Sequence, residues 1–303
     1  MFNETINATS NVLTGLLVNG SIPLSVTVNT ATNWTQFWLT AGIALITSFG
    51  LIALIYLPNL VRSISIGGLS KIFKMTQRNV VLIKHTEQGL FGGSMIDQQC
   101  LRDLSEVMNK FEGADFDLIL HSPGGDIFSS LTLSRLIKQY PGHIRAIIPL
   151  YSMSGGSLLA LSCKELLMTP NACIGPIDPQ LGSLFKFGSA KAWEEIVKFK
   201  GRKAEDQSIS FAMMGKQYTK SISAHLGQVI DFNLNASQKD KLIKFLTDGS
   251  IEHAYPLTIN DLIKFGIPVY TLSNKKFLKL LSKIISSPGK EGVTYYKKRK
   301  SLW

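Results

Sequence analysis

The sequence predicts an α/β protein with a mostly parallel sheet, a helical region after the sheet and one transmembrane helix before it. Between residues 79 and 168, short apolar runs typical of buried strands alternate with helical patterns of ten or more residues. After Pro179 the apolar spacing is mainly helical. Between Glu4 and Arg62 the chain carries no Asp, Glu, Lys or Arg, and a long apolar run lies in that stretch.

The alternating part can be divided by its apolar periodicity and its turn residues. Apolar residues recur three or four positions apart from Ile96 to Phe111, and residues 94–97 resemble a capping box. Connections between parallel strands are right-handed crossovers, so each helix should pack back on the sheet. The expected strands are 79–84, 118–120, 144–150 and 165–168, and the expected helices are 96–111, 127–137 and 154–163.

The region after Pro179 shows no internal repeat and reads as a series of helices. The last of them is amphipathic, with apolar residues set among lysines. Such a helix can pack on a neighbouring element or lie on a membrane surface, and packing is the favoured interpretation. The expected helices are 190–200, 207–231, 237–246, 259–265 and 275–285.

The run from Phe37 to Leu57 meets the ~20 residues needed to cross a ~30 Å hydrocarbon core, and Pro58 ends it. A cleaved signal peptide would begin with basic residues, which residues 1–36 lack. The linker 58–78 is basic, so the positive-inside rule places the N-terminus outside and the remainder in the cytoplasm. The expected location is the cell membrane, with a single pass and an Asn/Thr-rich external segment that carries glycosylation sequons.

The net charge of +11 indicates an acidic partner. Much of it lies beside the predicted span and in the tail, where basic residues favour anionic lipid headgroups of the bilayer. No basic stripe interleaved with aromatic residues supports nucleic-acid binding. The three cysteines have neither metal-ligand spacing nor a disulfide pattern, and no P-loop or dinucleotide motif is present. We therefore expect no metal and no cofactor.

Two glycine-bearing turns suggest an active site. The strand that ends near His121 continues as Ser-Pro-Gly124-Gly125, and Ser154 follows a later strand and opens a helix that starts with two glycines. A serine hydroxyl needs a base, an anion pocket and a fixed orientation to act as a nucleophile. The Gly155 N–H and an amide of the Gly124-Gly125 turn are suited to form that pocket, because glycine permits close approach and unusual backbone angles.

The segments HSPGG (121–125), SMSGG (152–156) and GPIDPQLG (175–182) resemble the repeated ββα superfold of Clp proteases and crotonases. More closely they are similar to membrane-bound serine proteinases related to signal peptide peptidase A, and most of all to the serine dehydrogenase proteinase family. The resemblance covers residues 79–272, expected to be the peptidase domain, followed by an amphipathic helix and basic tail at 273–303. It implies Ser154 as nucleophile, the Gly125 and Gly155 amides as oxyanion hole, peptide or membrane-protein substrates and a homo-oligomer.

The general base is the open point. Clp-type proteases place a histidine about 25 residues after the serine, where this chain has Asp178. Peptidases similar to signal peptide peptidase A use a lysine from the helical region downstream, so this resemblance implies a Ser-Lys dyad. A lysine serves as base only when its pKa falls far below ~10.4. Lys198 and then Lys200 are favoured, because they follow Ser154 at about the distance at which those peptidases place their lysine. Weaker alternatives are a catalytic part for His121 and a role for His253 in orienting a group at the site. The remaining lysine candidates are Lys186, Lys191, Lys203 and Lys216.

Other residues receive structural or binding roles. Gly124 and Asp178 are expected to contact substrate, with Asp178 anchoring the loop that lines the cleft. His85, His143 and His225 are interpreted as surface or loop residues. Two other functions stay open: a non-catalytic, membrane-tethered scaffold that binds peptides on the same fold, and an acyl-CoA enzyme of the crotonase kind, which has no use for a serine at the helix start.

Overall fold

The computed structural model describes residues 13–14, 25–26, 38, 41–48, 66–85, 95–183, 186–287 and 291–298, and the chain divides into two units, Met1–Leu57 and Pro58–Trp303. In the first unit, β1 (Leu13–Thr14) pairs antiparallel with β2 (Ser25–Val26), and residues 41–48 are helical. Most of the predicted transmembrane segment and all of the predicted sequons lie outside the described residues. Within those residues, no helix is both long and apolar enough to span a bilayer.

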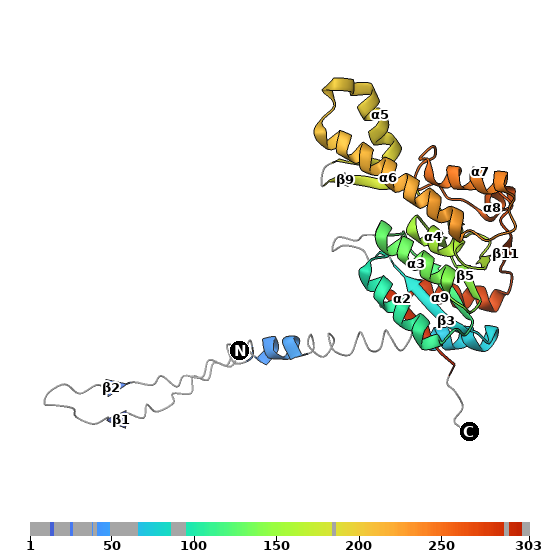
Figure 1. The fold of residues 1–303 in the computed structure, drawn as a ribbon. Coiled ribbons are helices and arrows are strands. Elements are labelled where there is room, and N and C mark those ends of the chain that lie inside the picture. Colours follow the sequence, from blue (N-terminus) through green and yellow to red (C-terminus); the bar gives the residue numbers. More distant parts are fainter. Residues whose placement is uncertain are drawn as a thin grey trace. The chain divides into compact units, whose positions relative to one another are not determined.

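The second unit is organised around a six-stranded sheet with the spatial order β11-β7-β5-β4-β3-β12 (Figure 1). All neighbouring strands are parallel except β12, which runs antiparallel to β3. This confirms the predicted α/β class and mostly parallel sheet. The strands are β3 (Asn79–Lys84), β4 (Phe116–His121), β5 (Ile144–Ile148), β7 (Glu165–Met168), β11 (Val269–Thr271) and β12 (Gly292–Tyr296).

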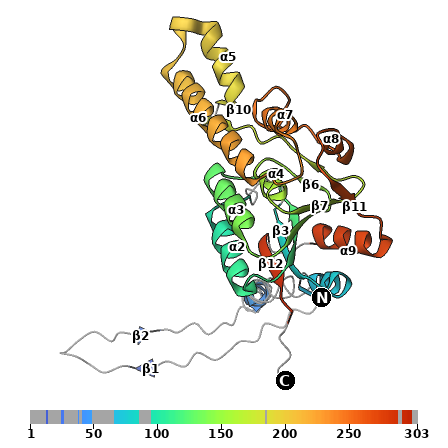
Figure 2. The ribbon, with the colours of Figure 1, turned by 45° about the vertical axis from the view of Figure 1, so that its right-hand side comes forward.

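One face of the sheet is covered by α2 (Gln98–Phe111), α3 (Ile127–Gln139) and α4 (Gly155–Leu161) (Figure 2). Strand residues alternate between faces, so Val81 and Ile83 join the main core on this side. The α2 helix begins after Asp97, whose carboxylate accepts a hydrogen bond from the Cys100 amide.

The opposite face carries a helix at residues 66–76 and α9 (Lys275–Ser286). Val80 and Leu82 point to this side and pack with Leu281 of α9. The buried Lys84 donates from Nζ to the Ser287 carbonyl, 2.6 Å away, just beyond the end of α9. The amphipathic helix therefore packs on the sheet, and residues 292–296 after it pair with β3 as β12.

A second, smaller row of paired segments lies next to the carboxyl ends of the main strands. The β6 strand (Tyr151–Ser152) pairs with β8 (Cys173–Ile174). Single bridges extend the row, because Ser122 pairs with Ser152 and Ile174 pairs with Leu257. Four segments that are distant in the sequence thus run side by side, and each continues into a loop of the candidate site.

The remaining elements form the helical region that the sequence predicts, with one addition. An antiparallel hairpin of β9 and β10 precedes α5, where no strand was expected. In both ribbon views α5 and the start of α6 project beyond the layered part (Figures 1 and 2). The elements are β9 (Gln180–Ser183), β10 (Lys186–Ser189), α5 (Ala190–Lys200), the 3₁₀ turn Gly201–Lys203, α6 (Asp206–Val229), α7 (Ala236–Thr247) and α8 (Ile259–Lys264).

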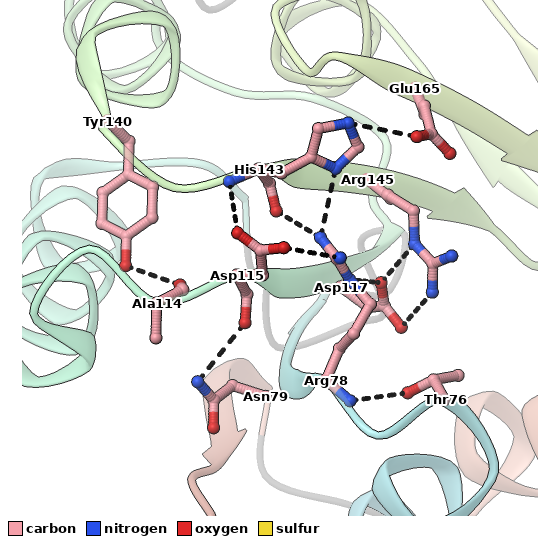
Figure 3. A network of polar contacts seen from close by, with 10 residues as sticks. All are labelled: Thr76, Arg78, Asn79, Ala114, Asp115, Asp117, Tyr140, His143, Arg145 and Glu165. Atoms are coloured by element: carbon pink, nitrogen blue, oxygen red, sulfur yellow. Dashed lines mark hydrogen bonds and ion pairs between the residues drawn. The ribbon is translucent and has the colours of Figure 1, made fainter.

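An ionic network centred on the buried Asp117 ties the amino ends of the parallel strands together (Figure 3). Asp117, fully buried on β4, accepts hydrogen bonds from Arg145 at 2.7 and 3.0 Å and from Arg78 at 3.1 Å. Arg78 also binds Asp115 at 2.9 Å, and His143 binds Glu165 at 3.1 Å. Ligands of parallel sheets bind at the carboxyl ends of the strands, so this network holds the opposite edge.

Candidate active site

Ser154 adopts a backbone conformation that residues with a side chain rarely take. Its φ is 49° and its ψ is −119°. Such a conformation persists only where the surrounding structure holds it, and it recurs at active sites. Because β6 ends at Ser152 and α4 begins at Gly155, the chain turns sharply from strand to helix at Ser154. A turn of this kind presents a side chain at the edge of a sheet.

The two glycine-bearing turns converge. A methyl group on Gly124 would lie 2.7 Å from the Ser154 Cβ and 3.2 Å from the Gly155 nitrogen. Gly124 also has a φ of +113°, so both space and backbone angle require glycine there. A methyl group on Gly125 would lie 2.0 Å from the Ile96 carbonyl oxygen, because the two backbones form a bridge.

Two backbone amides face the region beside Ser154. Within the described part of the chain, neither the Gly125 nor the Gly155 N–H donates a hydrogen bond. They are close together, since a methyl group on Gly155 would lie 3.5 Å from the Gly125 nitrogen. A pair of free, converging amides is the arrangement that stabilises an oxyanion.

The Gly124-Gly125 turn is held from behind by three hydrogen bonds. The Ser122 hydroxyl accepts from the Gly124 amide at 3.1 Å and lies 3.0 Å from His85 Nδ1. The Ile96 amide donates to the Gly124 carbonyl at 2.8 Å. Since these contacts fix the turn before any ligand binds, the amide of Gly125 is already oriented.

A pocket of about 380 Å³ opens beside Ser154. Its wall is mostly apolar, which suits a hydrophobic side chain of a ligand. Polar groups gather on the side of the two turns. The lining includes Gly124, Gly125, Ser154, Gly155, Asp178 and His253, with apolar contributions from Met95, Ile127, Leu131, Leu158, Ile177, Phe187 and Ile222.

Asp178 and His253 meet at this pocket although 75 residues separate them. His253 Nδ1 lies 2.7 Å from Asp178 Oδ1, and the other carboxylate oxygen accepts from Gln180 Nε2 at 2.7 Å. The Asp178 side chain is 2% exposed and that of His253 is 31% exposed. Asp178 anchors its loop as the sequence predicts, but its contact with His253 could not be inferred from local sequence.

The other histidines do not reach the pocket. His121 is buried against Tyr151, with ring centroids 4.3 Å apart. Burial, with smaller effects of Lys84 and His85, lowers the pKa of His121 to about 4, so it is neutral at physiological pH. His85 and His225, interpreted as surface or loop residues, do not lie on the surface. His85 follows β3 and supports the glycine turn, and His225 lies in α6 and binds Ser134 inside the core at 2.7 Å.

The predicted lysine bases lie away from the pocket. Lys198 is exposed on α5 and binds Glu195 at 2.7 Å, a hydrogen bond that raises the pKa of the amine. A general base requires a lowered pKa, so this environment opposes the role. Lys200 lies 3.8 Å from Glu205. No lysine of the described chain lines the pocket.

Comparison with known proteins identifies two relatives, and each match covers about two thirds of both chains. The chain is 31% identical over 199 residues to one uncharacterized protein of Methanocaldococcus jannaschii, covering 63% of this chain and 68% of the relative. A second uncharacterized protein of the same organism is 32% identical over 200 residues, covering 65% and 67% of the two chains.

Two solved structures match this chain with lower sequence identity. ClpP1 from Listeria monocytogenes is 17% identical, with a TM-score of 0.39, and the match covers 66% of this chain and 94% of ClpP1. A mutant of 1510-N, a membrane-bound stomatin-specific protease, is 19% identical, with a TM-score of 0.41, and the match covers 61% and 79% of the two chains.

The family comparison extends over most of the chain. The family described as ClpP-like SDH-type serine proteinase matches residues 58–296, which include both glycine-bearing turns, Asp178 and His253. This agrees with the resemblance that the motifs indicate. The protein belongs to the family of ClpP-like SDH-type serine proteinases.

Proposed function

We propose that the protein is a membrane-anchored serine endopeptidase that cleaves peptides or membrane-protein segments by acyl transfer through Ser154. The observation that carries this proposal is the contact between the two turns. It sets Ser154 against the free amides of Gly125 and Gly155 at the wall of an open pocket. Family membership supports the same class of reaction.

The geometry supports a separate role for each part of the site. The Ser154 hydroxyl oxygen attacks the carbonyl carbon of a bound peptide, and the negative charge that develops on the carbonyl oxygen is met by the two amides. One such donor is typically worth ~3 kcal/mol of transition-state stabilisation. The apolar wall takes a substrate side chain, and Gly124 leaves room for the peptide backbone next to the nucleophile.

The proposed reaction requires a general base that accepts the proton of the Ser154 hydroxyl. A lysine base at Lys198 or Lys200 stays a prediction, and the surroundings of both amines speak against it. The unfavourable surroundings of Lys198 and Lys200 also support the second candidate function, a scaffold that binds peptides without cutting them. Catalysis therefore has to be tested directly.

Hydrolysis by the detergent-solubilised full chain provides that test. The wild type is expected to release fluorescent peptides from labelled casein and to hydrolyse p-nitrophenyl acetate, whereas Ser154→Ala is expected to lose both activities. Ser221→Ala, at an exposed serine of α6, is the matched control and should retain them. A folded wild-type protein without either activity, or an active Ser154→Ala variant, would contradict a Ser154-dependent hydrolase.

The membrane anchor rests on the uncharged run at residues 37–57 and the basic residues that follow it. We expect the protein to resist extraction by alkaline carbonate and to dissolve in detergent. A tag before Met1 should be accessible on intact cells, and a tag after Trp303 only after permeabilisation. Release by carbonate would contradict the anchor, and reversed accessibility would contradict the orientation.

We further propose that the protein works as a homo-oligomer, which the resemblance to Clp-type proteases implies. Light scattering of the detergent-solubilised protein should give a protein mass that is a multiple of 33.4 kDa. A monomeric mass at all accessible concentrations would contradict this.

A further inference from the structure

We propose that His85 is a positioning residue for the reaction at Ser154. It fixes the hydroxyl of Ser122, and this hydroxyl in turn holds the Gly124-Gly125 turn. The inference rests on the proposed function, because the turn supplies one of the amides that meet the oxyanion. His85 is not among the described residues that line the pocket, so it acts on the reaction through its neighbours and not by contact with the substrate.

The Gly125 amide takes its direction from the peptide unit that joins it to Gly124. This unit is planar and trans, so its carbonyl oxygen and its N–H point in opposite directions. The Gly124 carbonyl accepts a hydrogen bond from the Ile96 amide at 2.8 Å and lies 3.4 Å from the Ser122 hydroxyl. The contacts that fix this carbonyl therefore also fix the direction of the Gly125 N–H.

The Ser122 hydroxyl is shared between the turn and the imidazole. It accepts a hydrogen bond from the Gly124 amide at 3.1 Å and lies 3.0 Å from Nδ1 of His85. Two consecutive glycines give the backbone of the turn wide conformational freedom, so a single orientation depends on contacts of this kind. Without the imidazole, the hydroxyl could rotate about its Cα–Cβ bond and release the Gly124 amide.

The contact between His85 and Ser122 is enclosed, since the two residues are 1% and 0% exposed. Burial lowers the pKa of His85, against smaller opposing effects of Asp97 and Glu291, so the ring is neutral at physiological pH. A neutral imidazole has one N–H and one lone pair, and a hydroxyl both donates and accepts, so the hydrogen bond forms in either tautomer. Loss of one partner would leave the other buried and unsatisfied, which holds the two side chains together.

The backbone of Ser122 connects this contact to the nucleophile. Its carbonyl accepts a hydrogen bond from the Met153 amide at 2.9 Å, and Met153 directly precedes Ser154. The backbone of His85 is fixed in the same way, because its amide donates to the His121 carbonyl at 2.8 Å. The side chain of Ser122 thus holds the glycine turn while its backbone holds the turn of the nucleophile.

The test measures hydrolysis of labelled casein by the full-length, detergent-solubilised protein and its variants. Leucine and asparagine have nearly the same size, but only the asparagine amide can replace Nδ1 as a hydrogen-bonding group. We expect His85→Leu to lower kcat about tenfold to a hundredfold, because the oxyanion contact is stronger in the transition state than in the bound substrate. KM should change by less than about twofold, and His85→Asn should retain most of the wild-type kcat.

A double-variant cycle tests whether His85 acts through Ser122. Ser122→Ala removes the group that the imidazole holds, so Ser122→Ala/His85→Leu should have the same kcat as Ser122→Ala alone. A purely structural role of His85 would add a loss of its own. His225→Leu is the matched control and should keep the wild-type kcat, because His225 is also buried and hydrogen-bonded to a serine, Ser134, but between α3 and α6.

A second pair of variants covers the case in which leucine prevents folding, which circular dichroism would reveal. The amide of His85→Asn occupies the position of Nδ1, whereas that of His85→Gln reaches the position of Nε2. Both side chains are polar, so they differ mainly in whether they can bind the Ser122 hydroxyl. We expect a higher kcat for His85→Asn.

The outcomes separate this inference from the proposed function. An active wild type with equal kcat values for folded His85→Leu and His85→Asn would overturn the role of His85 and leave Ser154 as nucleophile. Equal values for the asparagine and glutamine variants, or additive losses in the cycle, would do the same. A folded wild type without hydrolytic activity would overturn both proposals.

Discussion

Gly124 lies so close to Ser154 that a single methyl group on it would reach within 2.7 Å of the Ser154 Cβ. The two residues belong to different strand-to-helix turns, and their contact is what turns two ordinary loops into one candidate site. It also brings the Gly155 nitrogen within 3.2 Å of the same point. The arrangement makes the site sensitive to the smallest substitution at position 124.

We expect Gly124→Ala to reduce hydrolysis about a hundredfold or more, since a displacement of about 1 Å at a reacting group has that effect. The added methyl group would meet Ser154, and alanine is strained at a φ of +113°. Gly227→Ala is the control, because an added methyl group there would lie 3.9 Å from its nearest neighbour, Ile243, and alanine favours the α6 helix that contains Gly227. Equal activity of the two variants would contradict the account.

Stability should depend on pH through His121. Burial is the main cause that lowers its pKa to about 4, whereas an unfolded chain has the ordinary value of ~6.5. The unfolded state therefore binds the proton more readily, and folding stability is lost as the pH falls from about 6.5 to 4. At ~1.4 kcal/mol for each pH unit, this one side chain accounts for about 3 kcal/mol.

Denaturant titrations at pH 7 and pH 4.5 measure this effect in wild type and His121→Gln. At pH 7, the difference in the free energy of unfolding between the two proteins gives the packing cost of the substitution. Only the change of that difference with pH reports the titration. Identical pH dependence in both proteins would show that His121 does not titrate as described.

Asp117 should be important for stability rather than for chemistry. It is fully buried and binds both Arg78 and Arg145 (Figure 3). Removal of one partner from a buried ionic cluster typically costs 3–5 kcal/mol, which is the loss we expect for Asp117→Ala in the free energy of unfolding. The half-exposed Asp115 provides the comparison, and Asp115→Ala should cost clearly less. Similar losses of unfolding free energy in the two variants would contradict the view that the burial of Asp117 makes it important for stability.

The amphipathic helix α9 should stabilise the protein as a packing element. Leu281 lies on the buried face of α9 and is 1% exposed, so Leu281→Ala should lower the free energy of unfolding by about 2–5 kcal/mol. Leu278, on the same helix and only half-buried, should give a smaller loss. A helix used only for membrane binding would show weakened lipid association in both variants and no loss of stability.

Local patterns in the sequence were sufficient for much of the fold. The strand at 79–84 and the helix at 190–200 begin and end as expected, because apolar periodicity and turn residues are local signals. The pairing of the glycine turns also followed from the sequence, since parallel strands bring their carboxyl ends to one edge. The β12 strand was missed because it has no periodicity of its own and is defined by its pairing with β3.

The part of the site that the sequence did not reveal depends on long-range contacts. The bridge between Leu257 and Ile174 brings His253 and Asp178 together. Spacing along the chain does not predict this bridge. Lys198 was favoured because its distance from Ser154 in the sequence matches that of the lysine in related peptidases, and a distance along the chain does not show where α5 points. The Asp-Pro motif at Asp178 indicated an anchored loop, but it did not indicate that His253 is the residue that Asp178 binds.

The central claim is that Ser154 is an activated nucleophile, and mass spectrometry of the fluorophosphonate-treated protein tests it most directly. The account predicts one adduct for each chain, located by peptide mapping on Ser154 and absent from Ser154→Ala. A folded protein that carries no adduct, or carries it on a different residue, would contradict the claim.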